Sequence, residues 1–374
     1  MSAEDGGYGV GQRSAGGELV LPALNLSYPQ PTSPAPRIGL IGCGGISEHH
    51  LAAYQRLGFD VIALCNREWS KAEERAAQYY PGAAVYSSHV ELLEMSEVDV
   101  VDIATHPDGR SQLIHDSLDA GKHVLSQKPL CLNLDEVEPL IRLADEAGRC
   151  FAVNQNGRWA PHLAAMRFLS ESGVIGQLEE IEVSIRWDHS WTIGTPFDHT
   201  PFLVLFDFGI HWFDFISTLL GDQVLDRVEA RVARSPGQRS PQPMLAEVGM
   251  SGPGLRVRMT LDGDSAHLQR DVTLLRGSAG VITSEGPDLQ SQRVRVHAGG
   301  GSQEVPLHGG WFTTGFEGAM AELLCAVQAG RRPSHSAGGV LRSLELGFAA
   351  CESANTGVPV NPGTVRALPA PAMK

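Results

Sequence analysis

The sequence predicts a two-domain α/β protein, in which a doubly wound parallel sheet precedes an α/β domain with an open-faced, mainly antiparallel sheet. Strands and helices alternate from Arg37 to about Asn156, and strands with two-residue alternation follow with little helix between them. The 374 residues also exceed what one core usually spans. We place an N-terminal arm at 1–36, the parallel domain at 37–156 and the second domain at 157–374.

Composition excludes several classes of protein. A formal net charge of -14 disfavours nucleic acid as a partner, because phosphate binding needs a concentrated basic surface. The beginning of the chain lacks a basic region followed by a long apolar stretch, and no apolar run is long enough to span a membrane. We expect a cytoplasmic protein without membrane contact. The six cysteines show no CxxC pairing, which favours reduced thiols and no bound metal.

The first domain can be followed element by element. Residues before Pro36 are rich in Gly, Ser and Pro and predict an extended arm outside the fold, free to lie over a neighbouring subunit. RIGLIG then predicts a strand, and Ser47–Leu57 a helix. The next segments predict in turn strand, helix, strand, helix, strand, helix and strand: DVIALCN, WSKAEERAAQYY, VDVVDIAT, RSQLIHDSLDAG, KHVLSQKP, DEVEPLIRLADEAG and CFAVNQN.

The second domain shows a different pattern. Its strands are predicted at LEEIEVSIRW, RVEARVARS, LRVRMTLDG, RDVTLLRG and QRVRVHAG, and their alternation indicates a sheet with one covered face. Later helices are expected at Gly315–Ala329 and Val340–Ala354. The apolar segment Phe202–Leu220 predicts a further helix.

A glycine cluster follows the first strand. In Gly42-Cys43-Gly44-Gly45-Ile46-Ser47, the first two glycines match a dinucleotide-binding fingerprint and Ser47 stands at its third position. Gly42 permits the tight turn, and Gly44 allows the backbone to approach a pyrophosphate at the helix N-terminus. The position after a buried strand favours a Rossmann nucleotide site that includes Gly45 and Ile46. A glycine turn that serves packing alone is the alternative.

The end of the second strand bears on the choice of cofactor. An acid that binds the adenosine ribose is expected there, but the sequence has Asn66-Arg67. Neutral Asn66 does not repel a 2'-phosphate, and the Arg67 guanidinium could pair with it. The pattern favours NADP over NAD, although Arg67 could equally stack on adenine or face solvent.

Two further segments carry candidate catalytic groups. Lys128-Pro129 follows KHVLSQ, at the strand end where open α/β sheets bind ligands, although such a lysine is more often a surface residue. In the Phe202–Leu220 segment, Asp207, His211 and Asp214 share one helix face. A structural hydrogen-bond network, a metal site and an acid/base pair are all compatible with these three residues.

Together these motifs resemble the glucose-fructose oxidoreductase, inositol dehydrogenase and rhizopine-catabolism (Gfo/Idh/MocA) family. The resemblance covers Arg37 to about Pro359 and rests on GCGGIS, AGKHVLSQKP and the DFGIHWFD segment from Asp207 to Asp214. It implies a Rossmann domain with an open-faced α/β domain, and Lys128, Asp207 and His211 as the catalytic trio. Gln127 departs from the family's usual glutamate, which leaves the tuning of Lys128 open.

The resemblance implies hydride transfer between a nicotinamide and a carbon that bears a hydroxyl group on a sugar or polyol. His211 would accept the hydroxyl proton, and Lys128 would stabilise the developing alkoxide. Asp207 would orient the imidazole or bind a second substrate hydroxyl. A broad antiparallel sheet with one exposed face suggests a homodimer or homotetramer.

Other contacts are assigned by position. Arg158, Trp187 and Asp214 are candidates for binding a carbohydrate, together with the neighbouring Asp188, His189 and Trp191. Thr105, His106 and Gln127 are expected at the cofactor. His49 and His50 are interpreted as helix surface. An interface or core role is the alternative for each substrate candidate.

Two rival functions share this fold. An NAD-dependent glycosidase would oxidise a sugar transiently, eliminate its substituent and return the hydride. A ligand-sensing regulator would bind without catalysis. Retention of Lys128, Asp207 and His211 argues against the regulator, since a sensor needs no proton acceptor.

Overall fold

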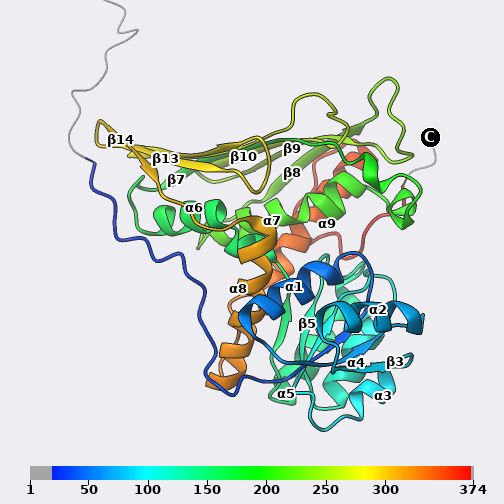
Figure 1. Cartoon of the computed structure of the whole chain (residues 1–374). Helices are drawn as coiled ribbons and strands as arrows, with labels where there is room; N and C mark the ends of the chain where they lie inside the picture. The colour runs from blue at the N-terminus through cyan, green and yellow to red at the C-terminus, as the bar shows by residue number, and fades with distance from the viewer. Residues whose placement is uncertain (1–18, 372–374) are drawn as a thin grey trace, which may run out of the picture.

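The computed structural model describes residues 19–371, which form two sheets with helices between and around them (Figure 1). The first sheet is parallel, with the order β3-β2-β1-β4-β5-β6. This doubly wound order places ligand sites beyond the carboxyl ends of the strands. The strands are β1 (Ile38–Ile41), β2 (Val61–Cys65), β3 (Ala84–Tyr86), β4 (Val100–Ile103), β5 (His123–Ser126) and β6 (Phe151–Val153).

Helices cover both faces of this sheet, so that β1, β4 and β6 are buried at every residue. The helix that follows the glycine cluster has the expected bounds and ends at Gly58, whose φ of 69° suits glycine. The short elements β3 and α3 were not predicted, because they are too brief to show periodicity. The helices are α1 (Ser47–Leu57), α2 (Trp69–Tyr79), α3 (His89–Leu93), α4 (Arg110–Asp119) and α5 (Leu134–Glu146).

The second sheet has the order β14-β13-β12-β11-β7-β10-β9-β8. All its pairs are antiparallel except β7 with β10, which are parallel. The mainly antiparallel prediction is therefore confirmed. The strands are β7 (Leu178–Arg186), β8 (Arg227–Ala233), β9 (Leu245–Gly252), β10 (Leu255–Asp262), β11 (Arg270–Gly277), β12 (Gly280–Gly286), β13 (Arg293–Ala298) and β14 (Gly301–Val305).

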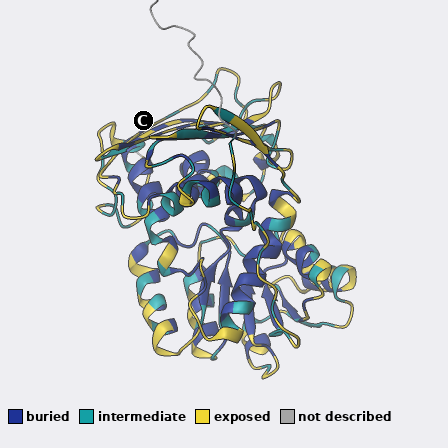
Figure 2. Ribbon diagram, turned by 90° about the vertical axis from the view of Figure 1, so that its left-hand side faces the viewer, coloured by how far each residue is buried: buried dark blue, intermediate teal, exposed yellow. Residues whose placement is uncertain are grey.

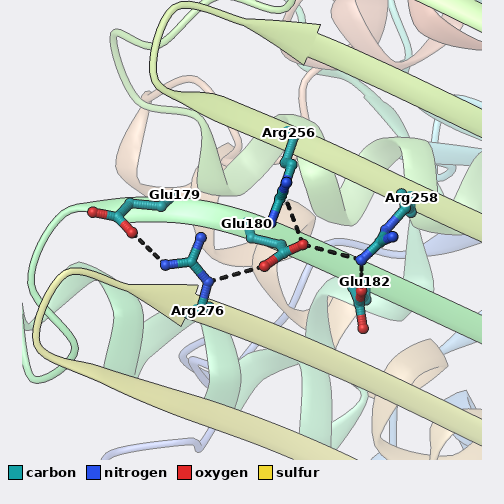
Figure 3. A network of polar contacts seen from close by, with 6 residues as sticks. All are labelled: Glu179, Glu180, Glu182, Arg256, Arg258 and Arg276. Atoms are coloured by element: carbon teal, nitrogen blue, oxygen red, sulfur yellow. Dashed lines mark hydrogen bonds and ion pairs between the residues drawn. The ribbon is translucent and has the colours of Figure 1, made fainter. Parts of the chain in front are cut away.

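One face of this sheet lies over helices and the other faces outward (Figures 1 and 2). The covering helices are α6 (Pro161–Glu171), which was not predicted, α7 (Ile210–Leu219) and α9 (Leu341–Thr356). The outward face carries arginine–glutamate pairs, and Glu180 of β7 accepts from Arg256 and Arg276 (Figure 3). These charges explain the two-residue alternation in the strands.

Helix α8 (Trp311–Ala329) joins the two halves of the molecule. It begins four residues before the predicted Gly315, because Gly310 and Thr313 cap its first turn. Its Phe316 and Met320 belong to the core that packs against α1 and β1. Because part of the second half returns to the first sheet in this way, the domain limits at 156 and 157 stay a prediction.

The N-terminal arm was predicted to lie outside the fold. Residues 1–18 fall outside the described residues, but the part that follows packs on its own chain and runs along α8 (Figure 1). The Tyr28 hydroxyl donates to Glu317 at 2.8 Å, and Thr32 exchanges hydrogen bonds with Gln328. For the described part, the expectation of a free arm is wrong, because the leucines and tyrosine between its prolines pack against the core.

No helix within residues 19–371 is long and apolar enough to cross a membrane. All six cysteines are free thiols, and four of them are buried.

Candidate active site

The glycine cluster forms an open turn between β1 and α1. Gly42 has φ of 101°, and a Cβ there would lie 2.8 Å from the carbonyl oxygen of Ala104. Gly44 and Gly45 face open space, with no heavy atom within 4 Å of a Cβ built on them. The backbone N–H groups of Gly45 and Ile46 make no hydrogen bond within the described chain. Open glycines and free donors at a helix N-terminus fit a pyrophosphate.

Asn66 and Arg67, both predicted to bind the cofactor, differ in their contacts within the chain. The Asn66 Oδ1 accepts from the backbone N–H of Cys43 at 3.1 Å, and its Nδ2 donates to the Glu68 carbonyl. Asn66 therefore fastens the glycine turn to the end of β2. Arg67 is exposed and makes no hydrogen bond or ion pair within the described residues, so its guanidinium is available to a ligand.

The end of β4 also faces this turn. The Thr105 hydroxyl is buried without a hydrogen-bond partner, and its methyl group approaches Gly42. Arg110, which the sequence analysis did not single out, is 1% exposed and donates to the backbone carbonyls of Thr105, Gln127 and Pro129. Burial lowers the pKa of Arg110 to about 9. Arg110 thus holds the end of β4 against the segment that carries the candidate catalytic lysine.

Lys128 and Asp207 meet across the two halves of the chain. The Lys128 Nζ lies 3.1 Å from Asp207 Oδ2 and 3.0 Å from the Asp207 carbonyl oxygen. The side chains keep 15% and 10% of their exposure, so the pair is partly open. Two of the three predicted catalytic residues are therefore in direct contact.

The segment that carries Asp207 is not one regular helix. Val204–Phe208 forms a π-helical turn, and α7 starts only at Ile210. Gly209 makes this junction possible, since a Cβ there would lie 2.5 Å from the Leu205 carbonyl. Asp207 therefore lies in the π-helical turn, whereas His211 and Asp214 lie in α7, so the three residues do not belong to the single regular helix that was predicted.

His211 lies on the first turn of α7, with its ring edge-on to Trp311 at a centroid distance of 5.2 Å. Its Nδ1 is buried and has no hydrogen-bond partner in the described chain. Burial and then the Lys128 ammonium lower the pKa of His211 well below its usual value. No hydrogen bond joins Asp207 to His211 among the described residues. The expectation that Asp207 orients the imidazole is therefore wrong, and Asp207 pairs with Lys128 instead.

Two of the residues predicted to bind substrate form a separate, saturated ion pair. Arg158 donates to both Asp214 oxygens, at 2.7 and 2.6 Å, and to the Ser334 carbonyl at 2.7 Å. Their side chains are only 8% and 3% exposed. Both residues are thus engaged within the protein, and their contact with a substrate stays a prediction. Trp187 is half-buried and packs against Trp212 with a centroid distance of 5.2 Å.

Gln127 and His50 are both buried. The Gln127 side chain is 5% exposed and bonds to His50 and to the backbone of Lys128, and its contact with a cofactor stays a prediction. His50 is fully buried rather than on the helix surface. Its neighbour His49 is exposed as expected, although its ring contacts Phe312.

Aromatic side chains from the loop after β7 stand beside Asp207. His189 stacks on Phe208 with centroids 4.0 Å apart, and Trp191 donates its indole N–H to His189 at 3.2 Å. Trp191 remains 57% exposed. Phe197 contacts His106 edge-on at 5.4 Å, which links this loop to the end of β4. Such a wall of aromatic rings is compatible with a carbohydrate ligand.

The fold combines a Rossmann sheet, which has an open glycine turn, with a second half that meets it at the Lys128–Asp207 ion pair. This combination defines a two-domain class of nucleotide-binding protein. Residues 36–155 match the family model GFO_IDH_MocA, described as an oxidoreductase family with an NAD-binding Rossmann fold. This part of the chain is therefore similar to the family that the motifs indicated.

The chain is similar to D-apiose dehydrogenase of Paraburkholderia graminis, with 30% identity over 52% of each chain. It is 24% identical to inositol 2-dehydrogenase of Rhizobium meliloti, over 85% of this chain and 96% of that one. Thus the chain spans about half the length of the first relative and nearly all of the second.

Solved structures share the fold. An oxidoreductase from Agrobacterium radiobacter, crystallised with NAD+, L-tartaric acid and magnesium, superposes with a TM-score of 0.79 at 21% identity. This match covers 88% of the present chain and 99% of that chain.

Proposed function

We propose that the protein is an NAD(P)-dependent oxidoreductase that transfers a hydride between nicotinamide and a secondary alcohol or ketone of a sugar, sugar derivative or polyol. The observation that carries the proposal is the contact of Lys128 Nζ with Asp207 Oδ2 at 3.1 Å, one turn before an imidazole with an unpartnered nitrogen. The named sugar and polyol dehydrogenases among its relatives support the substrate class.

The residues divide the chemistry between them. His211 is neutral near pH 7 because its pKa is lowered, so it is ready to accept the hydroxyl proton. Its Nδ1 is buried, so the half-buried ring would accept the hydroxyl proton at its other nitrogen, Nε2. The Lys128 ammonium would stabilise the alkoxide that develops as this proton leaves. Asp207 holds Lys128 in place. A bound nicotinamide supplies the hydride acceptor, or the donor in the reverse direction.

The glycine turn and the Thr105 hydroxyl would hold the cofactor. Arg67 supports a preference for NADP, since its free guanidinium could pair with a 2'-phosphate. Replacing Arg67 by alanine should weaken NADP binding about tenfold or more and NAD binding much less, measured by titration of each coenzyme. Equal losses would remove the preference.

The activity is tested by following reduction of NAD+ and NADP+ with a panel of sugars and polyols. We expect turnover of at least one of them, and we expect His211→Ala to abolish it while the affinity for coenzyme changes little. Activity of His211→Ala within a few fold of wild type would refute the proton-acceptor assignment. Release of an aglycone without net coenzyme reduction would instead identify the glycosidase cycle.

A homodimer or homotetramer stays a prediction. The outward face of the second sheet carries the arginine–glutamate pairs of Figure 3 and is not covered by the chain itself. Such a surface can meet a second copy of itself through complementary charges. Light scattering of the purified protein would determine the oligomeric state.

A further inference from the structure

A buried polar path leads from β4 to the candidate catalytic lysine through His50. His50 lies in the first turn of α1, immediately after the glycine turn, and is 0% exposed. Around its ring stand Asp102 of β4, Tyr54 of α1, and Gln127 and Asn154 from the ends of β5 and β6. None of these side chains is more than 5% exposed. Hydrogen bonds in such a place are costly to lose, because water cannot replace them, although Asp102 Oδ1 and Asn154 Oδ1 have no partner in the described chain.

The Nδ1 side of the ring can only donate. His50 Nδ1 lies 2.7 Å from Asp102 Oδ2, and the Tyr54 hydroxyl donates to the same oxygen at 2.6 Å. An ionised carboxylate has no hydrogen to offer. The proton between His50 and Asp102 therefore belongs to Nδ1.

The Nε2 side can only accept. Gln127 Oε1 accepts from the Lys128 backbone N–H at 2.6 Å, and this fixes which end of the Gln127 amide is oxygen. The Nε2 of Gln127 then points its hydrogens at His50 Nε2, 3.0 Å away. Both ends of the path are fixed, by a pure acceptor at Asp102 and a pure donor at Lys128. His50 is consequently a neutral imidazole with its hydrogen on Nδ1.

We propose that His50 is a positioning residue for Lys128, acting through Gln127. Its imidazole holds the Gln127 amide in the one orientation that accepts the Lys128 N–H, and so fixes where the lysine side chain leaves the end of β5. The inference rests on the proposed function, in which Lys128 acts on the reacting oxygen.

This path accounts for glutamine at position 127. A glutamate there would still accept from the Lys128 backbone, but its second oxygen would face His50 Nε2. His50 would then have to take up a proton and become an imidazolium between two carboxylates. Gln127 and neutral His50 are therefore matched to each other.

The matched experiment compares three variants of the full chain. His50→Phe removes the hydrogen bonds of the ring, and His50→Gln retains one donor and one acceptor. Tyr54→Phe deletes the buried hydrogen bond to Asp102 but keeps His50, Gln127 and the link between them. We expect His50→Phe to lower kcat about ten- to a hundredfold, because a displacement near 1 Å has that effect. The dissociation constant for NAD(P)H should change less than about threefold, and His50→Gln should recover most of kcat.

Tyr54→Phe is the control for stability. It should lower the melting temperature yet leave kcat within about twofold of wild type. If Tyr54→Phe loses as much kcat as His50→Phe, or if His50→Gln recovers none of it, the network is merely structural and the proposal is wrong. Should His50→Phe not fold, Gln127→Leu breaks the same path at its other end and carries the same expectation.

Two readouts do not depend on activity. Two-bond ¹⁵N–¹H NMR should show His50 as the Nδ1–H tautomer in wild type and doubly protonated in Gln127→Glu. Crystal structures should show the 3.1 Å contact between Lys128 Nζ and Asp207 Oδ2 lost in His50→Phe and kept in Tyr54→Phe. An Nε2–H tautomer in wild type, or an unmoved Lys128, would overturn the proposal. Absence of any dehydrogenase activity in wild type would instead count against the proposed function.

Discussion

Two ion pairs, seven residues apart along the segment that leads into and forms α7, show how differently the same chemistry can be used. Asp207 pairs with Lys128, and Asp214 pairs with Arg158. In both, the carboxylate comes from the second half of the chain and the cation from the end of a Rossmann strand or just beyond it. The sequence analysis treated all four residues as site residues.

The pairs differ in what they leave unused. Arg158 makes three hydrogen bonds, two of them to the two Asp214 oxygens, and the pair is almost inaccessible. Lys128 has a single carboxylate partner oxygen, is more exposed, and lies near an imidazole whose Nδ1 has no partner. A saturated buried pair holds elements together, whereas an incomplete pair can still bind a ligand. Local satisfaction of hydrogen bonds, rather than residue type, separates scaffold from candidate site.

The largest expected effect tests the incomplete pair. Replacing Lys128 by methionine should lower kcat/KM about a thousandfold or more, since loss of one strong electrostatic contact to a developing oxyanion costs about 3–4 kcal/mol. The free energy of unfolding should fall by less than in Arg158→Met, because this pair keeps more of its exposure than the Arg158–Asp214 pair. Steady-state kinetics and urea denaturation measure the two quantities. If Lys128→Met lost as much free energy of unfolding as Arg158→Met, the two ion pairs would not differ in their structural role.

The next effect concerns the saturated pair. Arg158→Met should lower the free energy of unfolding by about 3–5 kcal/mol, because Asp214 is left as a buried charge without its partner. The double variant Arg158→Met with Asp214→Leu should recover much of that loss, since it removes both charges. Denaturant melts of the single and double variants provide the measurement. If the double variant were as unstable as the single one, the uncompensated charge would not be the cause.

The smallest effect separates two histidines that both contact Trp311. The pKa of His162 is lowered to about 3 by burial alone, whereas that of His211 is lowered by burial and also by Lys128. Below pH 6.5 the unfolded chain protonates His162 while the folded chain does not, so stability falls as the pH falls toward 3.

Replacing His162 by leucine removes this contribution. Between pH 7 and pH 5, the free energy of unfolding of wild type should fall by about 2 kcal/mol more than that of His162→Leu. Urea melts at both pH values give the difference. In Lys128→Met the pKa of His211 should rise and that of His162 should stay, by NMR titration. A parallel pH dependence of wild type and His162→Leu would show that His162 titrates normally in the fold.

The sequence predicted the Rossmann elements well because each is encoded locally. Ser47–Leu57 has a glycine just beyond its end, and the strands of the parallel sheet read as uninterrupted apolar runs. Among the elements that escaped prediction, α3 and β3 are too short for their own periodicity to identify them, whereas α6 and β9 are of ordinary length and were missed. The arm was misjudged because its prolines indicate extension but do not reveal what the extended chain packs against.

Taken alone, the sequence determined the order of strands and helices, the glycine turn and the residue types that can move a proton, because these depend on neighbours a few positions away. Only the tertiary structure decided which carboxylate meets which cation, that His50 is buried, and that a π-turn separates Asp207 from the face of α7. Those outcomes depend on segments that are far apart in the sequence and compete for the same hydrogen bonds. A local sequence pattern does not show which of these segments meet in the fold.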